Sequence, residues 1–324
     1  MKTRKFLLPV LLAFAITIVY GKSQNYKFLN GSGELFKVLA TQGKISIQEN
    51  GIWKAVSTGD MLYETSTLKV SENGYVGLIH KSGKTVEVNK SGMYKIKELA
   101  SGLTSAKAGL VNKYAKYILG ELAKSDDKDL SKDHQDYLAV TGAVERNLSA
   151  FAINVLSPNK SDVINNSSIT LRWLSIEGVN TYVVNIMNRY EEPVLTEETT
   201  ATLLKVDLNK LNLKDEGVYF WSVYAKENPK IRSHDFAISH LAKDKISMVE
   251  EAFNALKGEL VEETAINNII MASFYEQNSL FLDAINSYEE AIKIAPGVNA
   301  YKIAYKNFLD RLGLGYYFRY DIKK

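Results

Sequence analysis

The spacing of hydrophobic residues changes three times along the 324-residue chain, and these changes constrain its fold more than any single motif. Residues 35–97 and 153–239 alternate apolar and polar positions, which is typical of β-strands. Residues 103–148 and 244–314 repeat apolar residues every three or four positions, which is typical of amphipathic helices. We therefore expect a multidomain α+β protein, with an N-terminal β-meander domain, a central β-sandwich and C-terminal helical hairpins.

Residues 1–23 have the composition of a secretory signal peptide. Several basic residues precede an apolar run over residues 6–20, and small polar residues follow it. The run is shorter than the roughly 20 residues that a membrane-spanning helix needs. We expect cleavage after Ser23 or, as the next choice, after Gly21. An uncleaved N-terminal anchor, the one expected route to membrane contact, is the alternative.

Charge and cysteine content narrow the class of protein further. The full chain has 40 basic and 37 acidic residues, a net charge of +3. Residues 1–23 contain four of the basic residues and none of the acidic ones, so their removal leaves 36 basic and 37 acidic residues and a net charge of −1. A nearly neutral chain with dispersed charges argues against a nucleic-acid partner. The chain has no cysteine, which excludes disulfides, thiol nucleophiles and cysteine metal sites. These features favour an exported protein of the bacterial envelope, periplasmic or envelope-associated.

Turn signals define the expected β-domain over residues 24–100. Asn50-Gly51 and Asn73-Gly74 are typical of two-residue hairpin turns, whose central residues need positive φ. The same segment contains further residues that are typical of turns and of a β-domain core, namely Gly51-x-Trp53, Gly59-Asp60-x-Leu62, Leu68 and Val70. On these residues the segment resembles the FecR-type periplasmic domain. The alternation also predicts that Trp53 is buried in the core of this domain.

Residues 101–150 are expected to be a helical linker. Leu110, Val111, Tyr114, Ile118 and Leu122 fall on one face of an amphipathic helix. A charged, solvated stretch follows, with a second short helix possible before Asn147.

Residues 151–240 return to strand periodicity. Trp173, Tyr182, Tyr219 and Trp221 occur at spacings that resemble a fibronectin type III or immunoglobulin-like sandwich, in which a Trp is buried and a Tyr lies near a strand corner. We expect Trp221 to lie in the core of this domain, separate from the core of the preceding one.

Residues 241–324 are helical in period throughout. Five residues stand where a tetratricopeptide (TPR) repeat carries Tyr, Ala, an aromatic residue, Ala and Pro, namely Tyr275, Ala284, Tyr288, Ala291 and Pro296. This resemblance implies two antiparallel helices that approach closely. Because one repeat cannot bury its hydrophobic face alone, we expect the flanking helices to complete a four-helix unit.

No pattern of catalytic residues is recognisable. The chain lacks a nucleophile elbow, a phosphate-binding glycine loop and a His-Glu-x-x-His motif. His234 and His240 are interpreted as surface or structural residues, not as metal ligands. Paired acidic residues are interpreted as solvated helix faces, since adjacent helical residues diverge; they are Glu250/Glu251, Glu262/Glu263 and Glu289/Glu290. We expect neither an enzyme nor a cofactor or metal.

These observations predict an exported, non-enzymatic adaptor or scaffold of the bacterial cell envelope that acts through protein–protein interaction. The alternative is an envelope sensing or regulatory component related to FecR-type signalling. For the adaptor, the inner face of the first TPR-like helix is the expected partner-binding surface. Its candidate residues are Asn267, Asn268, Met271 and Tyr275.

Overall fold

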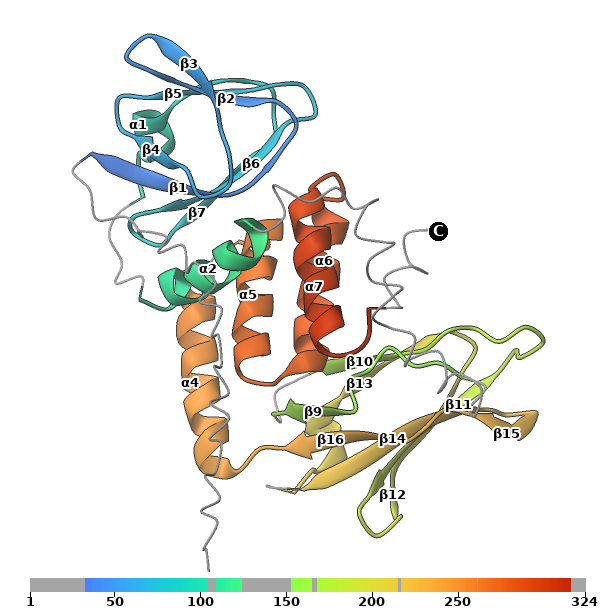
Figure 1. Ribbon diagram of the computed structural model, residues 1–324. Helices are drawn as coiled ribbons and strands as arrows, with labels where there is room; N and C mark the ends of the chain where they lie inside the picture. The colour runs from blue at the N-terminus through green and yellow to red at the C-terminus, as the bar shows by residue number, and fades with distance from the viewer. Residues whose placement is uncertain are drawn as a thin grey trace, which may run out of the picture.

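The computed structural model describes residues 33–103, 109–123, 153–164, 168–214, 217–260 and 262–315. Within them, a helical unit lies between an N-terminal β-domain and a central β-sandwich (Figure 1). This confirms the expected multidomain α+β class. The signal-peptide segment, the charged stretch and the possible helix before Asn147 lie outside the described residues.

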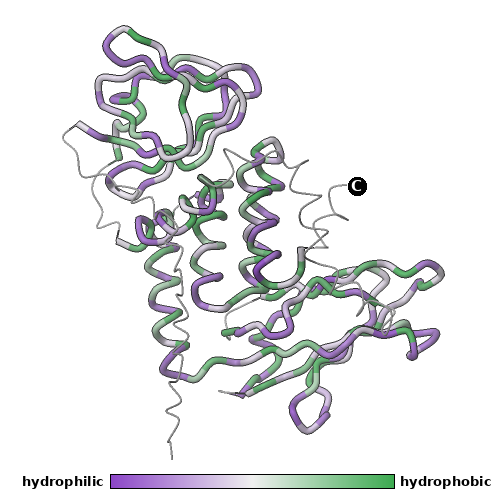
Figure 2. Tube along the Cα trace, in the orientation of Figure 1, coloured by the Kyte–Doolittle hydropathy of each residue, from purple (hydrophilic) through white to green (hydrophobic). Residues whose placement is uncertain are grey.

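The N-terminal β-domain consists of two four-stranded antiparallel sheets, with strand orders β4-β1-β6-β7 and β3-β2-β5-β8. Hydrophobic and hydrophilic residues alternate along much of it (Figure 2). Phe36, Leu62, Leu68 and Leu78 are fully buried in its core. Its elements are β1 (Glu34–Gln42), β2 (Ile45–Glu49), β3 (Ile52–Ala55), β4 (Met61–Tyr63), β5 (Thr67–Val70), β6 (Tyr75–His80), β7 (Thr85–Val88), β8 (Gly92–Lys95) and the short helix α1 (Ile96–Leu99).

Of the two predicted hairpin turns, the structure confirms one and contradicts the other. Asn50 and Gly51 have φ of 51° and 83° and join the paired strands β2 and β3, as expected. The prediction for Asn73-Gly74 was wrong, because β5 and β6 belong to different sheets and Gly74 has no positive φ. The pair instead turns a corner between the sheets. Gly74 is needed there because a Cβ would lie 2.9 Å from the Ser71 carbonyl oxygen.

The prediction that Trp53 is a core residue was also wrong. Its side chain is 41% exposed, and all four residues of the edge strand β3 are exposed. The ammonium of Lys69, on β5 of the same sheet, lies 5.9 Å from the centre of the Trp53 ring. Alternation places a residue on one face of a strand, but only a covering element decides whether that face is buried.

The central domain is a β-sandwich. Its larger sheet has the order β12-β11-β14-β16-β9, with β15 paired to β14, and its smaller sheet pairs β10 with β13. The strands are β9 (Lys160–Val163), β10 (Ser168–Arg172), β11 (Tyr182–Asn188), β12 (Pro193–Thr199), β13 (Leu203–Asp207), β14 (Val218–Ala225), β15 (Asn228–Arg232) and β16 (Phe236–His240), with a 3-10 turn, η3, at Leu208–Leu211.

Aromatic residues organise the core of the sandwich. Trp221 is fully buried, which confirms its predicted place, and the ring of Trp173 packs edge-on against Tyr182 at a centroid distance of 5.5 Å. The Tyr219 hydroxyl accepts a hydrogen bond of 2.7 Å from the backbone N–H of Lys214, just upstream. A Tyr that bonds back to the preceding loop is the tyrosine corner of immunoglobulin-like sandwiches.

The helical unit contains α2 in addition to the four expected helices. The apolar face of α2 is buried against α4, α5 and α7, with Val111, Ile118 and Leu122 fully inaccessible. Helix α2 is therefore part of this core. The helices are α2 (Gly109–Leu122), α4 (Lys243–Glu259), α5 (Ala265–Gln277), α6 (Phe281–Ile294) and α7 (Asn299–Arg311).

Helices α5 and α6 pack closely against each other. Ala284, Tyr288 and Ala291 of α6 are fully buried, and α6 makes its most extensive helical contact with α5. Small alanines allow this close approach, and Pro296 stands two residues beyond the end of α6, where it cannot interrupt a helix interior.

Both faces of the sheet nearest the helices are covered. On β1 and β6, Val38 and Leu78 point into the core of the β-domain, whereas Leu39 and Ile79 pack in the core of the helical unit. All six residues of β6 are consequently buried. The helical unit thus supplies the second face of this sheet.

Candidate functional site

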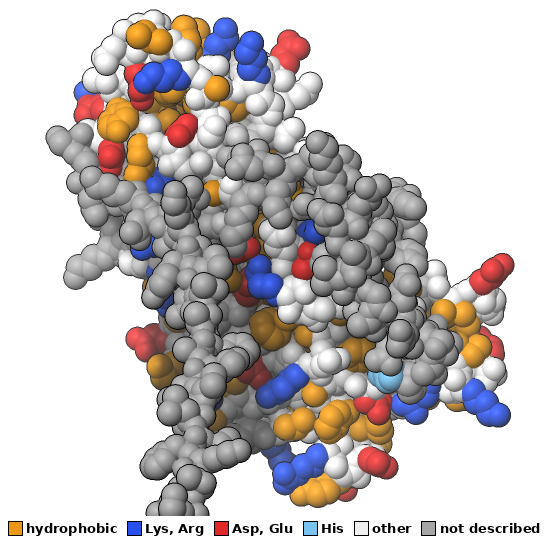
Figure 3. Space-filling view, viewed as in Figure 1, with side chains coloured by type: hydrophobic (Ala, Val, Ile, Leu, Met, Phe, Trp, Pro, Cys, Tyr) orange, Lys and Arg blue, Asp and Glu red, His pale blue; other side chains and the backbone are white. Residues whose placement is uncertain are grey.

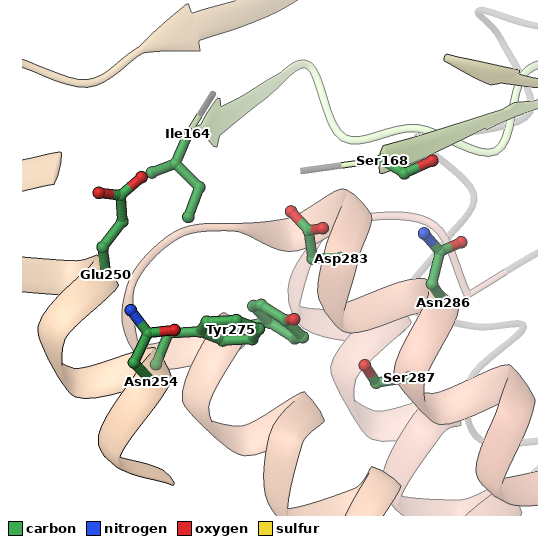
Figure 4. A pocket seen from close by; sticks show the side chains of 9 residues that line it. Ile164, Ser168, Glu250, Asn254, Tyr275, Asp283, Asn286 and Ser287 are labelled. Carbon is green, nitrogen blue, oxygen red and sulfur yellow. The ribbon is translucent and has the colours of Figure 1, made fainter. Parts of the chain in front are cut away.

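A pocket of about 400 Å³ lies where the helical unit meets the sandwich (Figure 4). Helices α4, α5 and α6 form most of its wall, and the ends of β9 and β10 close it from the sandwich side. The lining residues are Ile164, Ser168, Glu250, Phe253, Asn254, Tyr275, Asp283, Asn286 and Ser287. Its volume falls within the range of small-molecule binding sites.

Asp283 is the most unusual residue of the pocket. It lies in the first turn of α6, is only 7% exposed, and its Oδ2 atom has no hydrogen-bond partner in the part of the chain that the structure describes. Figure 4 shows its carboxylate pointing away from α6 toward the strand side of the pocket. Burial raises the pKa of this carboxyl from 3.8 to about 7, although a hydrogen bond from its own backbone N–H opposes the shift.

A second acceptor lies one helical turn further on. The Oδ1 atom of Asn286 is buried without a partner among the described residues, and Asn286 lines the pocket with its neighbour Ser287. Positions 283, 286 and 287 share one face of a helix because they are three or four residues apart. The opposite wall is aromatic, with the rings of Phe253 and Tyr275 at a centroid distance of 6.2 Å.

An adjoining hollow of about 460 Å³ continues along α6 and shares Ser168, Asn286 and Ser287 with the pocket. Its walls carry charges of both signs. Arg172 of β10 pairs with Glu289 of α6 at 2.7 Å, and both side chains are mostly buried. The expected solvated role was therefore wrong for Glu289, because the sandwich covers that face of α6.

The structure separates the four predicted partner-binding residues. Tyr275 lines the pocket, Asn268 lines the adjoining hollow, and Met271 packs against the helical core. Asn267 is 5% exposed; its amide oxygen accepts from the Thr85 hydroxyl at 2.6 Å, so it fastens α5 to the β-domain. The partner-binding role of this set stays a prediction.

Sequence reasoning missed most of the pocket. Asp283, Asn286 and Ser287 lie within the TPR-like pattern, but the residues that match the pattern there are the packing residues Ala284 and Tyr288. The available signal was three polar residues on one face of a helix whose neighbouring positions are apolar. The residues from α4 and the sandwich had no sequence signal, because only the tertiary fold brings them to α6.

The histidines and acidic residues of the described ranges form no group of three or more that could hold a metal ion. His240 is buried at the end of β16, whereas His234 is exposed before that strand. None of the helices in these ranges is both long and apolar enough to cross a bilayer. Figure 3 shows one face of the molecule, on which the acidic and basic side chains of the described residues are interspersed with one another.

No protein-family model matches the chain, and no curated protein matches its sequence. Among solved structures, the chain is similar to the one titled "Structures of Clostridium thermocellum CbhA fibronectin(III)-like modules". The identity is 8% and the TM-score 0.21, over 65% of this chain and 90% of that chain. Because this TM-score is too low to support an inference, the sandwich assignment rests on the strand order and the tyrosine corner described above. The FecR-type and TPR resemblances stay predictions.

Proposed function

We propose that this protein is an exported, non-enzymatic adaptor of the bacterial cell envelope that binds a segment of a protein partner in the pocket between α4, α5, α6 and the sandwich. The basic and apolar N-terminus supports export, and the absence of cysteine fits the envelope of a bacterium. The observation that carries the binding role is the presence of two buried acceptors, on Asp283 and Asn286, that have no hydrogen-bond partner among the described residues.

Unsatisfied buried acceptors favour a binding site for energetic reasons. Most buried polar groups of native proteins have a hydrogen-bond partner, and a buried one left without a partner costs about 1–3 kcal/mol. A partner segment that brings N–H donors into the pocket removes this cost on binding. The free energy that destabilises the isolated chain thereby contributes to affinity.

The position of the pocket also suits an adaptor. Its walls come from two separate parts of the molecule, the helical unit and the sandwich, which are held together by the Arg172–Glu289 ion pair and by a hydrogen bond of 2.9 Å from the Asp162 N–H to the Ser279 carbonyl. Two connected modules present a preformed surface, which reduces the entropy lost when a partner binds. The TPR-like hairpin α5–α6 supplies one wall of this surface.

Site-specific crosslinking tests the binding role. A photo-crosslinking amino acid replaces Asn254, an exposed residue at the pocket wall, and in a matched chain it replaces Glu197 on the exposed strand β12. We expect a discrete adduct in the envelope fraction from position 254 alone, and its loss when Asp283→Asn is added. The same adducts from both positions, or none from position 254, would contradict the proposal.

Mass spectrometry of the mature chain tests export separately. We expect an N-terminus at Gln24 or Lys22. An intact Met1 in the envelope fraction would show that the N-terminal segment is retained as an anchor.

A further inference from the structure

The described wall of the pocket offers hydrogen-bond acceptors and acidic side chains. Asp283 contributes a carboxylate oxygen and Asn286 an amide oxygen, both without a partner, and the Glu250 side chain of α4 lies at the same wall. Among the described residues that line the pocket, none is Lys, Arg or His. A ligand that complements this wall therefore has to bring several donors and a positive charge.

The remaining walls suit an alkyl stem. Ile164 closes the strand side, and the rings of Phe253 and Tyr275 form the side opposite α6. A Lys-like group places apolar methylenes against such surfaces while its ammonium reaches polar atoms. Aromatic rings also attract a neighbouring ammonium through their electron-rich faces.

Other ligand classes fit less well. An anion would be repelled by the buried carboxylate of Asp283. A neutral polyol would donate hydrogen bonds but leave the negative charge of that carboxylate uncompensated in a buried site. The planar, always charged guanidinium is best matched by two parallel carboxylate oxygens, whereas one Oδ2 atom and one amide oxygen are the unpaired acceptors here.

We propose that this pocket binds a primary ammonium group on an alkyl stem, with the carboxylate of Asp283 as its counter-ion and the amide oxygen of Asn286 as a second acceptor. The ammonium is that of a lysine side chain on the partner segment or that of a free aliphatic amine. Only the first of these sources rests on the proposed adaptor function.

The pH dependence of binding depends on Asp283 and on the other residues that line the pocket with it. These are Glu250 from α4 and Tyr275 from α5, while β9 and β10 contribute the uncharged Ile164 and Ser168. Burial raises the pKa of Asp283 to about 7, so its ionised fraction rises from roughly a tenth at pH 6 to nine-tenths at pH 8. An alkylammonium stays charged across this range. Its affinity should therefore increase about tenfold from pH 6 to pH 8.

Calorimetric and thermal-shift titrations of the full chain test the proposal with pentylamine as the probe. Pentanol is the uncharged control and pentanoate the anionic one. We expect pentylamine alone to bind and to raise the melting temperature. Asp283→Asn should weaken this binding at least about tenfold, whereas Asp244→Asn, an exposed residue of α4 with the same charge change, should not.

Several results would overturn the ammonium site. These are equal binding of pentanol and pentylamine, equal binding to wild type and Asp283→Asn, no binding of pentylamine, or an affinity that falls from pH 6 to pH 8. Asp283→Asn is nearly isosteric, and its near-ultraviolet circular dichroism shows whether the fold is intact. If it is not, Asn286→Leu is the second variant, and it should weaken pentylamine binding without removing its pH dependence.

A peptide pair separates this inference from the proposed function. The probes are an acetylated and amidated Ala-Ala-Lys-Ala-Ala peptide and the same peptide with Nε-acetyllysine. Binding of the first and not the second supports lysine as the source. Binding of pentylamine without the lysine peptide keeps the ammonium site but assigns it to a free amine. A crosslinked partner without any amine binding keeps the adaptor function and rejects the ammonium site.

Discussion

The helical unit has one interface with the β-domain and another with the sandwich, here called the β-domain joint and the sandwich joint. The two differ in whether their buried polar groups have hydrogen-bond partners. At the β-domain, buried polar groups are paired with one another. The Tyr75 hydroxyl donates to Glu87 at 2.8 Å, so the Tyr301 hydroxyl, 2.7 Å away, donates to Tyr75. Glu87 also accepts from the backbone N–H of Ile266, in the first turn of α5, at 2.7 Å. At the sandwich, Asp283 and Asn286 have unpaired acceptors beside a pocket.

Both joints contain the first turn of a helix and a carboxylate, yet the two carboxylates have opposite surroundings. Glu87 satisfies an N–H group at the start of α5, where the helix dipole favours negative charge. Asp283, in the first turn of α6, keeps one oxygen without a partner. The first joint therefore pairs its polar groups across two parts of the chain, whereas the second has a pocket with unpaired acceptors, where we propose that a ligand binds.

The largest effect is expected from breaking the β-domain joint at Tyr301. This side chain is fully buried and packs edge-on against Tyr75. Tyr301→Ala should lower the free energy of unfolding by about 3–5 kcal/mol, the usual cost of truncating a large buried aromatic side chain. Hydrogen-exchange mass spectrometry should show faster exchange in β1, β6 and α7. An equal increase in β11 and β14 would mean that the two joints unfold as one unit.

At the sandwich joint, Asp283→Asn should raise the free energy of unfolding, whereas Tyr301→Ala lowers it. The folded pKa of about 7 lies above the ordinary 3.8, so the contribution of Asp283 to wild-type stability is undiminished below pH 3.8, declines as the pH rises to about 7, and stays lower above it. The variant should therefore equal wild type at low pH and exceed it at pH 8, by up to roughly 4 kcal/mol. Urea unfolding at several pH values measures this. A constant difference at every pH would show that the carboxyl titrates normally.

A smaller loss is expected from Glu87→Gln at the β-domain joint. The change keeps the shape of the side chain but removes the charge that accepts from Tyr75 and from the start of α5. We expect a loss of about 1–3 kcal/mol of unfolding free energy and faster exchange in the first turn of α5. Glu72→Gln, at an exposed position of the same domain, is the control and should change little. Equal effects would mean that Glu87 does not fasten the two parts.

The smallest effect is expected from Arg172→Met, which removes the ion pair with Glu289 at the sandwich joint. Both side chains are about a quarter exposed, and the methionine retains an apolar stem. A partly exposed ion pair contributes at most about 1 kcal/mol, so the melting temperature should fall slightly, and less at high salt. A loss as large as that of Tyr301→Ala would show that both joints are equally important for stability.

Local sequence patterns were sufficient for the element types and for several faces. The Asn50-Gly51 turn, the buried face of α2 and the core position of Trp221 follow from φ preferences and from periodicity, which depend on neighbours within a few residues. The continuous apolar run of β6 also fits a strand covered on both faces, although its second cover was not foreseen.

The tertiary structure alone decided which faces were covered and where polar residues met. Trp53 and Trp221 both follow alternating patterns, yet no described element covers the first, whereas two sheets enclose the second. Asn267 bonds to Thr85 of the β-domain because α5 begins against that sheet. The pocket needs α4, α5, α6 and two strands, brought together from positions 164 to 287. Local sequence determines the orientation of a side chain along its own element, but burial depends on contacts between distant segments, which only the folded chain establishes.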